Sequence, residues 1–503
     1  MVANFPALTG SSRVLSGIPW SLLSYAATRV LTLLTALILA RILGKESFGL
    51  VGMALLAISA LNALTEMGLA NTVVLQRDLS QRAQGSMLTL LTILGAAGAS
   101  IGVLTAPLVA IALGDPRVES LMQALAVMVL LSGPTVFIEG LMRRDFVFKR
   151  HFVCSLAAGA SQLAVGVGMA STGFGIWSIV GGQLAYRIVL LGSMLLLSTS
   201  LVRPAWDVRD AMQGLRSGGG FLAQSLIWFV GANVDYIVVG RAFGAASFGL
   251  YSMAYRLAEL PMQAIANPVA RVTYPAYTAL HHRGEDPTSL FLRQLRYLAL
   301  VACPCGFLLS ATAGPFSVSL LGREWADMAG VLTLLALWGA VEPLQNALTW
   351  WFNGLGLQKL VAVRSMVILV PSIGAFVMAA ASGSLLAIAA VILLRVAFMY
   401  GSLLVIGARR AQMTVAEQAR AVRPALLGCF AAWPAARGVS DAIEPPALAL
   451  AFALVAGLGV YVGVVRFAAP GLLSEGLGYL RRSVRRRGPA GQEPQATDIA
   501  SGG

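Results

Sequence analysis

Apolar runs long enough to cross a lipid bilayer recur through this sequence, from about Trp20 to about Phe467. A helix of about 20 apolar residues spans the hydrocarbon core, whereas a membrane β-strand is about ten residues long and alternates in polarity. The runs are continuous and rich in Leu, Ala and Gly, and 57% of all residues are apolar while 12% are charged. Because backbone groups in lipid must bond within their own segment, the runs predict an all-α polytopic membrane protein and exclude a β-barrel.

The runs divide into about fourteen expected transmembrane helices. Their expected ranges are 17–41, 48–68, 87–113, 118–140, 151–171, 174–201, 215–240, 248–268, 290–314, 328–352, 360–383, 385–406, 421–438 and 446–467. The segment before residue 17 lacks the short apolar core and the small-residue cleavage site of a secretory signal, so the first helix is expected to remain as a span.

The basic residues outside these runs indicate the orientation. When the N-terminus is placed in the cytoplasm and the sides alternate, most of the 36 Lys and Arg residues fall on the cytoplasmic side. The set on the outer side is small: Arg41, Lys45, Arg117, Arg241, Arg323 and Arg437. This bias predicts that both termini are cytoplasmic. The net charge of +14 is then a topology signal and an anchor to membrane lipid, and it indicates no nucleic-acid partner.

An internal repeat organises the chain. Residues 41–54 align without a gap with residues 241–254, and eight of the fourteen positions are identical. Six expected helices fit within the offset, and an even number returns the chain to the same side of the membrane. The two halves are therefore predicted to be parallel repeats about an axis along the membrane normal. A cleft between two such halves can open to either side by rocking, so the repeat indicates transport.

The repeat and the apolar runs together predict four regions. Residues 1–207 form a lobe of helices one to six, and residues 208–410 form a second lobe of helices seven to twelve. Residues 411–467 add two further helices. Residues 468–503 form a basic tail that is expected to be disordered, because it is rich in Arg, Gly, Pro and Gln.

Polar side chains inside the expected spans mark the candidate site, because such groups are costly in lipid and turn towards a protein interior or a water-filled cavity. They recur at three-to-four spacing in helices one, two, seven and eight. The candidates for the cavity and its substrate are Tyr25, Arg29, Asn62, Arg187, Gln224, Arg256, Glu259 and Arg395, and the candidates for ion coupling are Asp235 and Glu342. Two alternatives stay open: the hydroxyl groups bond to their own helices, and Asp235 is a fixed counter-ion to Arg29 or Arg256.

The sequence contains no pattern for covalent chemistry. The segment Gly354-Leu-Gly-Leu-Gln-Lys359 has the wrong spacing for a phosphate-binding loop. Cys303 and Cys305 have no second cysteine pair and no nearby histidine, so no metal site is expected. We therefore expect no cofactor, no metal and no enzymatic activity.

Several segments together resemble the polysaccharide-transporter (Wzx-type) family of the multidrug/oligosaccharidyl-lipid/polysaccharide flippase superfamily. They are Arg41-Ile-Leu-Gly44 with Ser47-Phe48-Gly49, Gly68-Leu69 with Leu75-Gln76-Arg77, Gly173-Phe-Gly-Ile-Trp177-Ser, Asp235-Tyr-Ile-Val-Val-Gly-Arg241, Ala254-Tyr255-Arg256, the stretch from Pro261 to Pro275, and Leu321-Gly322 with Trp325. Each segment is weak alone, but their order covers about residues 15–405.

The resemblance implies a V-shaped pair of six-helix lobes around a cationic cavity, followed here by two extra helices. Members of the family move undecaprenyl-diphosphate-linked oligosaccharides from the inner to the outer leaflet of the bacterial inner membrane, for exopolysaccharide, capsule or O-antigen assembly. A polysaccharide polymerase or export machinery is then a possible contact. Two alternatives remain: a multidrug antiporter of the same superfamily, which the deep arginines oppose, and a membrane enzyme of polysaccharide assembly, for which a long outer loop would be expected.

Overall fold

The structure is a computed structural model that describes residues 11–66, 80–145, 147–198, 202–410 and 413–470, and side chains within them other than 11–26, 210–211, 213–228 and 408–410. This part of the chain is helical. The helices are α1 (Ser11–Glu66), α3 (Gln81–Leu113), α4 (Arg117–Arg144), α5 (Phe148–Ser171), α6 (Trp177–Leu197), α7 (Val208–Ala258), α8 (Asn267–His282), α9 (Thr288–Ala311), α10 (Ala313–Phe316), α11 (Met328–Gly354), α12 (Gln358–Ala381), α13 (Leu385–Arg410), α14 (Val415–Ala442) and α15 (Pro446–Ala468). The segment 68–77, which contributes to the family resemblance, and most of the basic tail lie outside the described residues.

Eleven helical stretches among the described residues are long and apolar enough to cross a membrane, which confirms the helical polytopic class. Two of them, Ala27–Thr65 and Phe229–His282, each combine two of the expected spans. The α14 helix, expected as the thirteenth span, is not among the eleven. The count of fourteen spans therefore stays a prediction.

The two double-length stretches bend at equivalent glycines of the repeat. Gly44 interrupts α1 with φ 72° and ψ 175°, and Gly244 interrupts α7 with φ 76° and ψ −177°. A residue with a Cβ rarely adopts positive φ, so glycine is needed at both bends. The structure thus repeats, at an offset of 200 residues, the same turn between two successive helices.

The helical segments that follow the two bends pack against each other. A Cβ on Gly49 would lie 1.7 Å from the carbonyl oxygen of Ala245, and a Cβ on Gly249 would lie 2.0 Å from that of Lys45. Each contact becomes the other when 200 is added to or subtracted from the residue numbers. A pseudo-twofold axis therefore passes between Gly49 and Gly249, as expected for parallel repeats.

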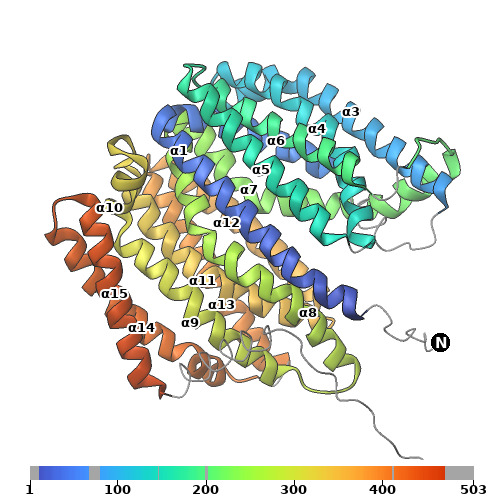
Figure 1. Cartoon of the computed structure of the whole chain (residues 1–503). Helices are drawn as coiled ribbons and strands as arrows, with labels where there is room; N and C mark the ends of the chain where they lie inside the picture. The colour runs from blue at the N-terminus through green and yellow to red at the C-terminus, as the bar shows by residue number, and fades with distance from the viewer. Residues whose placement is uncertain (1–10, 67–79, 146, 199–201, 411–412, 471–503) are drawn as a thin grey trace, which may run out of the picture.

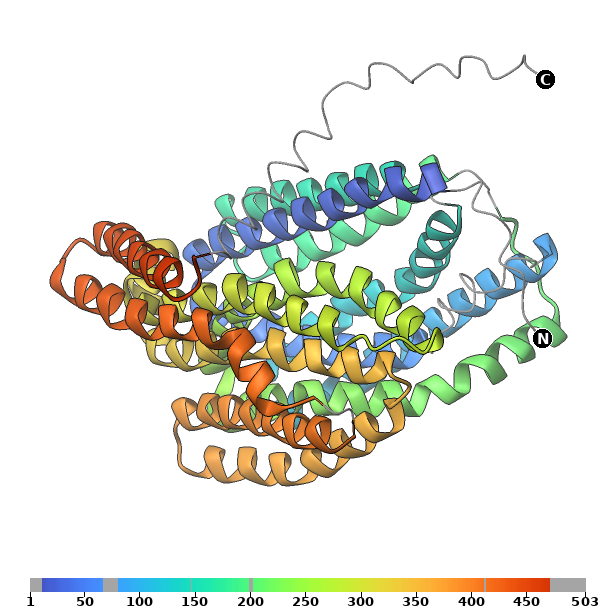
Figure 2. The same ribbon diagram turned by 90° about the horizontal axis from the view of Figure 1, so that it is seen from below.

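The helices group around this crossing. Figure 1 shows α1 running diagonally between α3 to α6 on one side and α9 to α13 on the other. In Figure 2, α14 and α15 lie at the outer edge, away from α3 to α6. The Trp433 indole Nε1 donates to Ser310 Oγ at 3.2 Å, and the Tyr461 hydroxyl donates to the carbonyl oxygen of Leu300 at 2.7 Å. These bonds hold the two C-terminal helices against α9.

The expected eighth span, 248–268, is too short. The helix continues through a π-helical turn at Met262–Ala266 into α8 and ends at His282. The Asn267 N–H donates to the carbonyl oxygen of Met262, five residues earlier. Prolines lie at positions 261, 268 and 275 of this stretch, and the helix nevertheless continues through the π-turn. Residues 245–282 then measure about 57 Å at 1.5 Å per residue, well beyond the hydrocarbon core of about 30 Å.

Candidate functional site

A cavity of about 880 Å³ lies between the two halves of the protein. The first half lines it mainly with α1 and α6, and the second half with α7, the π-turn, α11 and α13. Among the described residues, five charged ones face it: Arg29, Arg256, Glu259, Glu342 and Arg395. All five were candidates from the sequence, and the structure brings them together around one space.

The arginines come from both lobes. Arg29 lies on α1 in the first half, while Arg256 on α7 and Arg395 on α13 lie in the second half. Counted along the helices at 1.5 Å per residue, Arg29 and Arg256 are about 22 Å and about 18 Å from the bends at Gly44 and Gly244. Leu56, the repeat equivalent of Arg256, also lines the cavity, so the charge is not duplicated by the repeat.

Arg256 and Glu259 do not form an ion pair. Among the described residues, the ion pairs within 4.0 Å include neither side chain. Glu259 instead accepts a hydrogen bond from Gln263 Nε2 at 2.6 Å. The Arg256 guanidinium therefore keeps its donors for the cavity, where a bidentate guanidinium suits a phosphate.

Arg395 connects two helices of the second lobe. Its Nη1 donates to the carbonyl oxygen of Gly231 at 3.0 Å, and its guanidinium carbon lies 5.7 Å from the centre of the Phe376 ring. These two contacts hold the guanidinium at the cavity wall.

Asp235 does not line the cavity. The residue is 1% exposed, and the Tyr251 hydroxyl donates to its Oδ2 at 2.5 Å, while Oδ1 has no partner in the structure. The bond runs between the segments before and after the Gly244 bend. A change in the angle of this bend would therefore change the hydrogen bond between Tyr251 and Asp235.

Two other candidates lie outside the cavity lining, and the side chains of two more are not described. Asn62 and Arg187 are not among the described lining residues, although Tyr186 is. Tyr25 and Gln224 lie outside the described side chains. Their roles remain predictions.

The structure adds residues that the sequence analysis did not single out. They are mainly aromatic and amide side chains: Gln162, Gln183, Tyr186, Tyr236, Tyr255, Trp338, Gln345 and Asn346. The residues on α11 have a signal in the sequence, because positions 338, 342, 345 and 346 share one face of a helix. The three-to-four spacing of these positions in the tenth expected span is the pattern that indicates this face.

One end of the cavity is closed by contacts between the lobes, and we call it the closed end. Phe48 lines the cavity and packs edge-on against Trp325, with ring centres 6.0 Å apart. The Trp325 indole Nε1 donates to the carbonyl oxygen of Ala40 at 3.1 Å, and Arg41 Nη1 donates to that of Ser319 at 3.1 Å. These bonds join α1 of the first lobe to the segment between α10 and α11 of the second.

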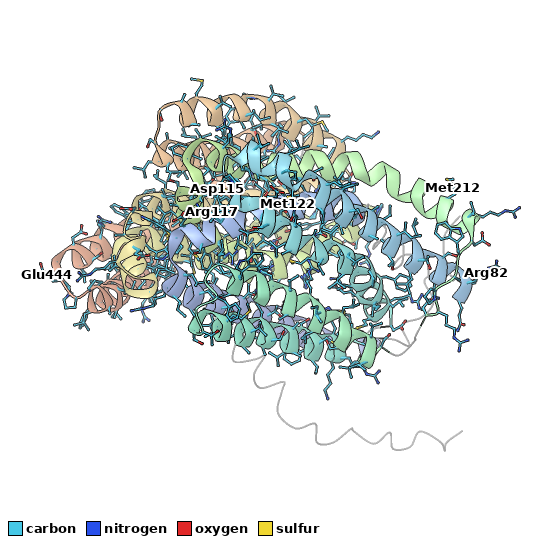
Figure 3. The ribbon with its side chains drawn as sticks, turned by 90° about the horizontal axis from the view of Figure 1, so that it is seen from above. Arg82, Asp115, Arg117, Met122, Met212 and Glu444 are labelled. Carbon is cyan, nitrogen blue, oxygen red and sulfur yellow. The ribbon has the colours of Figure 1, made fainter. Side chains whose placement is uncertain are left out.

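An ion cluster lies at the start of α4. Arg117 Nη2 lies 2.7 Å from Glu46 Oε1 and 2.8 Å from Asp115 Oδ2. The hydrogen bond from the Arg117 side chain holds the pKa of the Asp115 carboxyl below its usual value. In Figure 3, Asp115 and Arg117 lie together, at the opposite end of the helices from Arg82 and Met212. The cluster fastens the α3–α4 turn to the bend of α1.

No group of three or more His, Cys, Asp and Glu side chains in the described ranges could hold a metal ion. Two related helical halves around a charged central cavity are the architecture of a membrane transporter. The chain belongs to the family described as "Polysaccharide biosynthesis protein", whose model matches residues 38–330. The resemblance to polysaccharide transporters seen in the sequence is confirmed.

Two curated relatives cover most of the chain. The succinoglycan biosynthesis transport protein ExoT of Rhizobium meliloti (strain 1021) is 26% identical over 378 residues, which are 74% of this chain and 75% of ExoT. The lipopolysaccharide biosynthesis protein WzxC of Escherichia coli (strain K12) is 23% identical over 339 residues, which are 66% of this chain and 68% of WzxC.

Solved structures share the fold. The lipid II flippase MurJ in an inward closed conformation matches with a TM-score of 0.75 at 13% identity, over 90% of this chain and 99% of that chain. An inward-facing multidrug resistance MATE family transporter of the MOP superfamily matches with a TM-score of 0.61 at 16% identity, over 76% of this chain and 94% of that chain. The two-lobed helical fold predicted from the sequence is confirmed.

Proposed function

We propose that the protein is a flippase that moves undecaprenyl-diphosphate-linked oligosaccharides from the inner to the outer leaflet of the bacterial inner membrane by alternating access. The observation that carries this proposal is the set of arginines on both walls of one cavity between the lobes, Arg29, Arg256 and Arg395. The translocated oligosaccharide would serve exopolysaccharide, capsule or O-antigen assembly.

The chemistry of the cargo fits this cavity. A diphosphate with a sugar chain cannot cross hydrocarbon unaided, since burying its charge without partners is very costly. Guanidinium groups on opposite lobes replace water around the diphosphate by charge-assisted hydrogen bonds. The polyprenyl chain needs no such shelter, because it is as apolar as the lipid and stays in the bilayer between the lobes.

The relatives favour the same reading. ExoT is named as a transport protein of succinoglycan biosynthesis, and WzxC as a protein of lipopolysaccharide biosynthesis. We propose a transporter rather than an enzyme on this basis. Both termini would lie in the cytoplasm, so that the closed end, near Lys45 and Ala246, would face the periplasm.

The second candidate is an antiporter for organic cations. It is favoured by the fold shared with a multidrug transporter and by Glu259 and Glu342 in the cavity. The arginines oppose it, because three guanidinium groups repel a cationic substrate.

Deleting the gene in its own bacterium tests the proposal. We expect undecaprenyl-diphosphate-linked oligosaccharide to accumulate on the cytoplasmic side, the extracellular polymer to disappear, and both to recover when the wild-type gene is returned. Unchanged polymer and lipid-linked sugar, together with higher sensitivity to organic cations, would instead identify the antiporter.

A further inference from the structure

The α11 helix presents a polar and aromatic face to the cavity. Trp338, Glu342, Gln345 and Asn346 all line it, and they follow one another over two turns of the helix. The Trp338 ring lies 4.5 Å from that of Tyr255, measured between ring centres. This face lies in the same cavity as Arg256, yet it carries no cation.

One hydrogen-bond acceptor on this face is buried and has no protein partner. The Oε2 atom of Glu342 is buried and accepts no hydrogen bond in the structure. Gln345 Nε2 donates to Thr349 Oγ1 at 2.9 Å, and Asn346 Nδ2 donates to the backbone carbonyl of Glu342 at 3.2 Å. Those bonds engage the amide nitrogens, and among the described residues neither amide oxygen accepts a bond. A buried acceptor without a partner is unfavourable, so a ligand that donates a hydrogen bond to Glu342 would be stabilised here, and the amide oxygens beside it can accept further bonds.

The pseudo-twofold symmetry does not require this face. The counterpart of α11 in the first lobe is α4, the fourth helix of its half, and both helices contain a proline, Pro343 and Pro134. No residue of α4 lines the cavity. Of the two related helices, only α11 has its polar groups on the substrate space, which points to a role in binding rather than in holding the fold.

We propose that Trp338, Glu342, Gln345 and Asn346 bind the sugar part of the lipid-linked substrate and set which glycan is carried. This inference rests on the proposed function. A sugar ring offers several neighbouring hydroxyl groups as donors, which match the carboxylate and the two amide oxygens. It also offers apolar C–H edges, which pack on the faces of aromatic rings such as Trp338 and Tyr255.

The cavity then has two kinds of wall. Arg29 and Arg256 recognise the diphosphate, which every substrate of this class carries, and α11 recognises the sugar, which differs between polymers. Sites built to bond hydroxyl groups discriminate strongly, because an analogue that lacks the hydroxyl leaves buried acceptors without partners. Specificity for the glycan therefore falls on α11.

The experiment measures binding by purified full-length protein of two probes: undecaprenyl diphosphate, and the undecaprenyl-diphosphate-linked oligosaccharide extracted from the deletion strain. We expect the wild type to bind the sugar-carrying lipid at least tenfold more tightly. Glu342→Gln and Asn346→Ala should each reduce this preference about three- to tenfold, while binding of undecaprenyl diphosphate stays unchanged. Arg256→Ala should weaken both probes alike. Glu444→Gln, in the exposed α14–α15 turn and outside the cavity lining, is the matched control.

Each other result would overturn the inference. Equal binding of both probes by the wild type, or equal losses for both probes in Glu342→Gln, rejects a sugar site on α11 without affecting the flippase proposal. A Glu342→Gln variant that keeps the preference but changes the pH dependence of export assigns Glu342 to coupling instead. Failure of the wild type to bind either lipid, with tight binding of tetraphenylphosphonium that Glu342→Gln abolishes, rejects the proposed function as well.

Discussion

Lys45 and Asp327 form an ion pair that joins the two lobes: Lys45 Nζ lies 2.8 Å from Asp327 Oδ2. The pair lies at the closed end, where Lys45 follows the Gly44 bend and Asp327 precedes α11. Because α11 also carries the Trp338–Asn346 face, any opening of the closed end moves that face relative to Arg29 on α1. The closed end and two of the cavity walls thus share the helices α1 and α11.

The first prediction concerns this ion pair. Exposed ion pairs contribute about 0.2–1 kcal/mol, so removing this one with Lys45→Met is expected to favour opening of the closed end by no more than about fivefold. The readout is the labelling rate of a cavity cysteine, Ser252→Cys, by an impermeant thiol reagent added outside, in a background with the exposed Cys305 changed to Ser. Lys45→Glu combined with Asp327→Lys should restore the original rate. Equal rates in all three proteins would show that the pair does not hold the lobes together.

The second prediction concerns the glycine crossing. In Gly49→Ala and Gly249→Ala, the added methyl carbon would lie 1.7 Å and 2.0 Å from the carbonyl oxygens of Ala245 and Lys45. The two helices must therefore separate. Overpacking of this kind costs about 1–3 kcal/mol, and we expect a larger increase in outside labelling than Lys45→Met gives. The control is Gly192→Ala on α6, where a Cβ would meet nothing within 4 Å. Labelling that rises equally in the control would point to general destabilisation.

The sequence predicted the repeat and its consequences well, because identical residues at a fixed offset adopt the same turn. The match of residues 41–54 with 241–254 is reproduced by the bends at Gly44 and Gly244. The charged cavity residues were predicted on a separate ground, because a charge deep in a span must turn towards a polar space.

The α11 wall was not predicted, because Trp338, Gln345 and Asn346 are ordinary in a helix and only their shared face makes them a site. Asp235 shows the opposite limit. Its charge marked it as a cavity residue, but a partner in the chain, Tyr251, holds it in the packed interior. Such pairing depends on tertiary contacts that spacing alone does not contain. The length of the eighth helix was missed because a π-turn has no distinct sequence pattern.

The third prediction concerns Asp235 as the ion-coupling residue. Asp235→Asn keeps the size of the side chain and an acceptor oxygen for Tyr251 but removes the titration and the charge. If a proton or sodium ion binds here, export by the variant should no longer respond to external pH or sodium. Tyr251→Phe is the control, because it removes the bond and keeps the carboxyl. Export by Asp235→Asn that follows the wild-type pH and sodium dependence would leave Asp235 a structural residue.

The last prediction concerns Arg256 and the diphosphate. A charge-assisted hydrogen bond is worth roughly 1.5–3 kcal/mol, or about 10- to 150-fold in affinity. Arg256→Ala should therefore cripple polymer export while the protein reaches the membrane in normal amount. Arg256→Lys should keep part of the activity, because the charge remains and the bidentate fork is lost.

Membrane abundance separates this role from a structural one. If Arg256 merely balanced Glu259, Arg256→Ala would lower the amount of protein, and Arg256→Ala with Glu259→Gln would recover it. The ion pairs between described residues do not include Arg256–Glu259, and Gln263 bonds to Glu259 instead. Both facts argue that Arg256→Ala reaches the membrane in normal amount. Normal export by Arg256→Ala would rule out a diphosphate site at this residue, since neither the loss of charge nor the loss of the fork would then have been felt by the substrate.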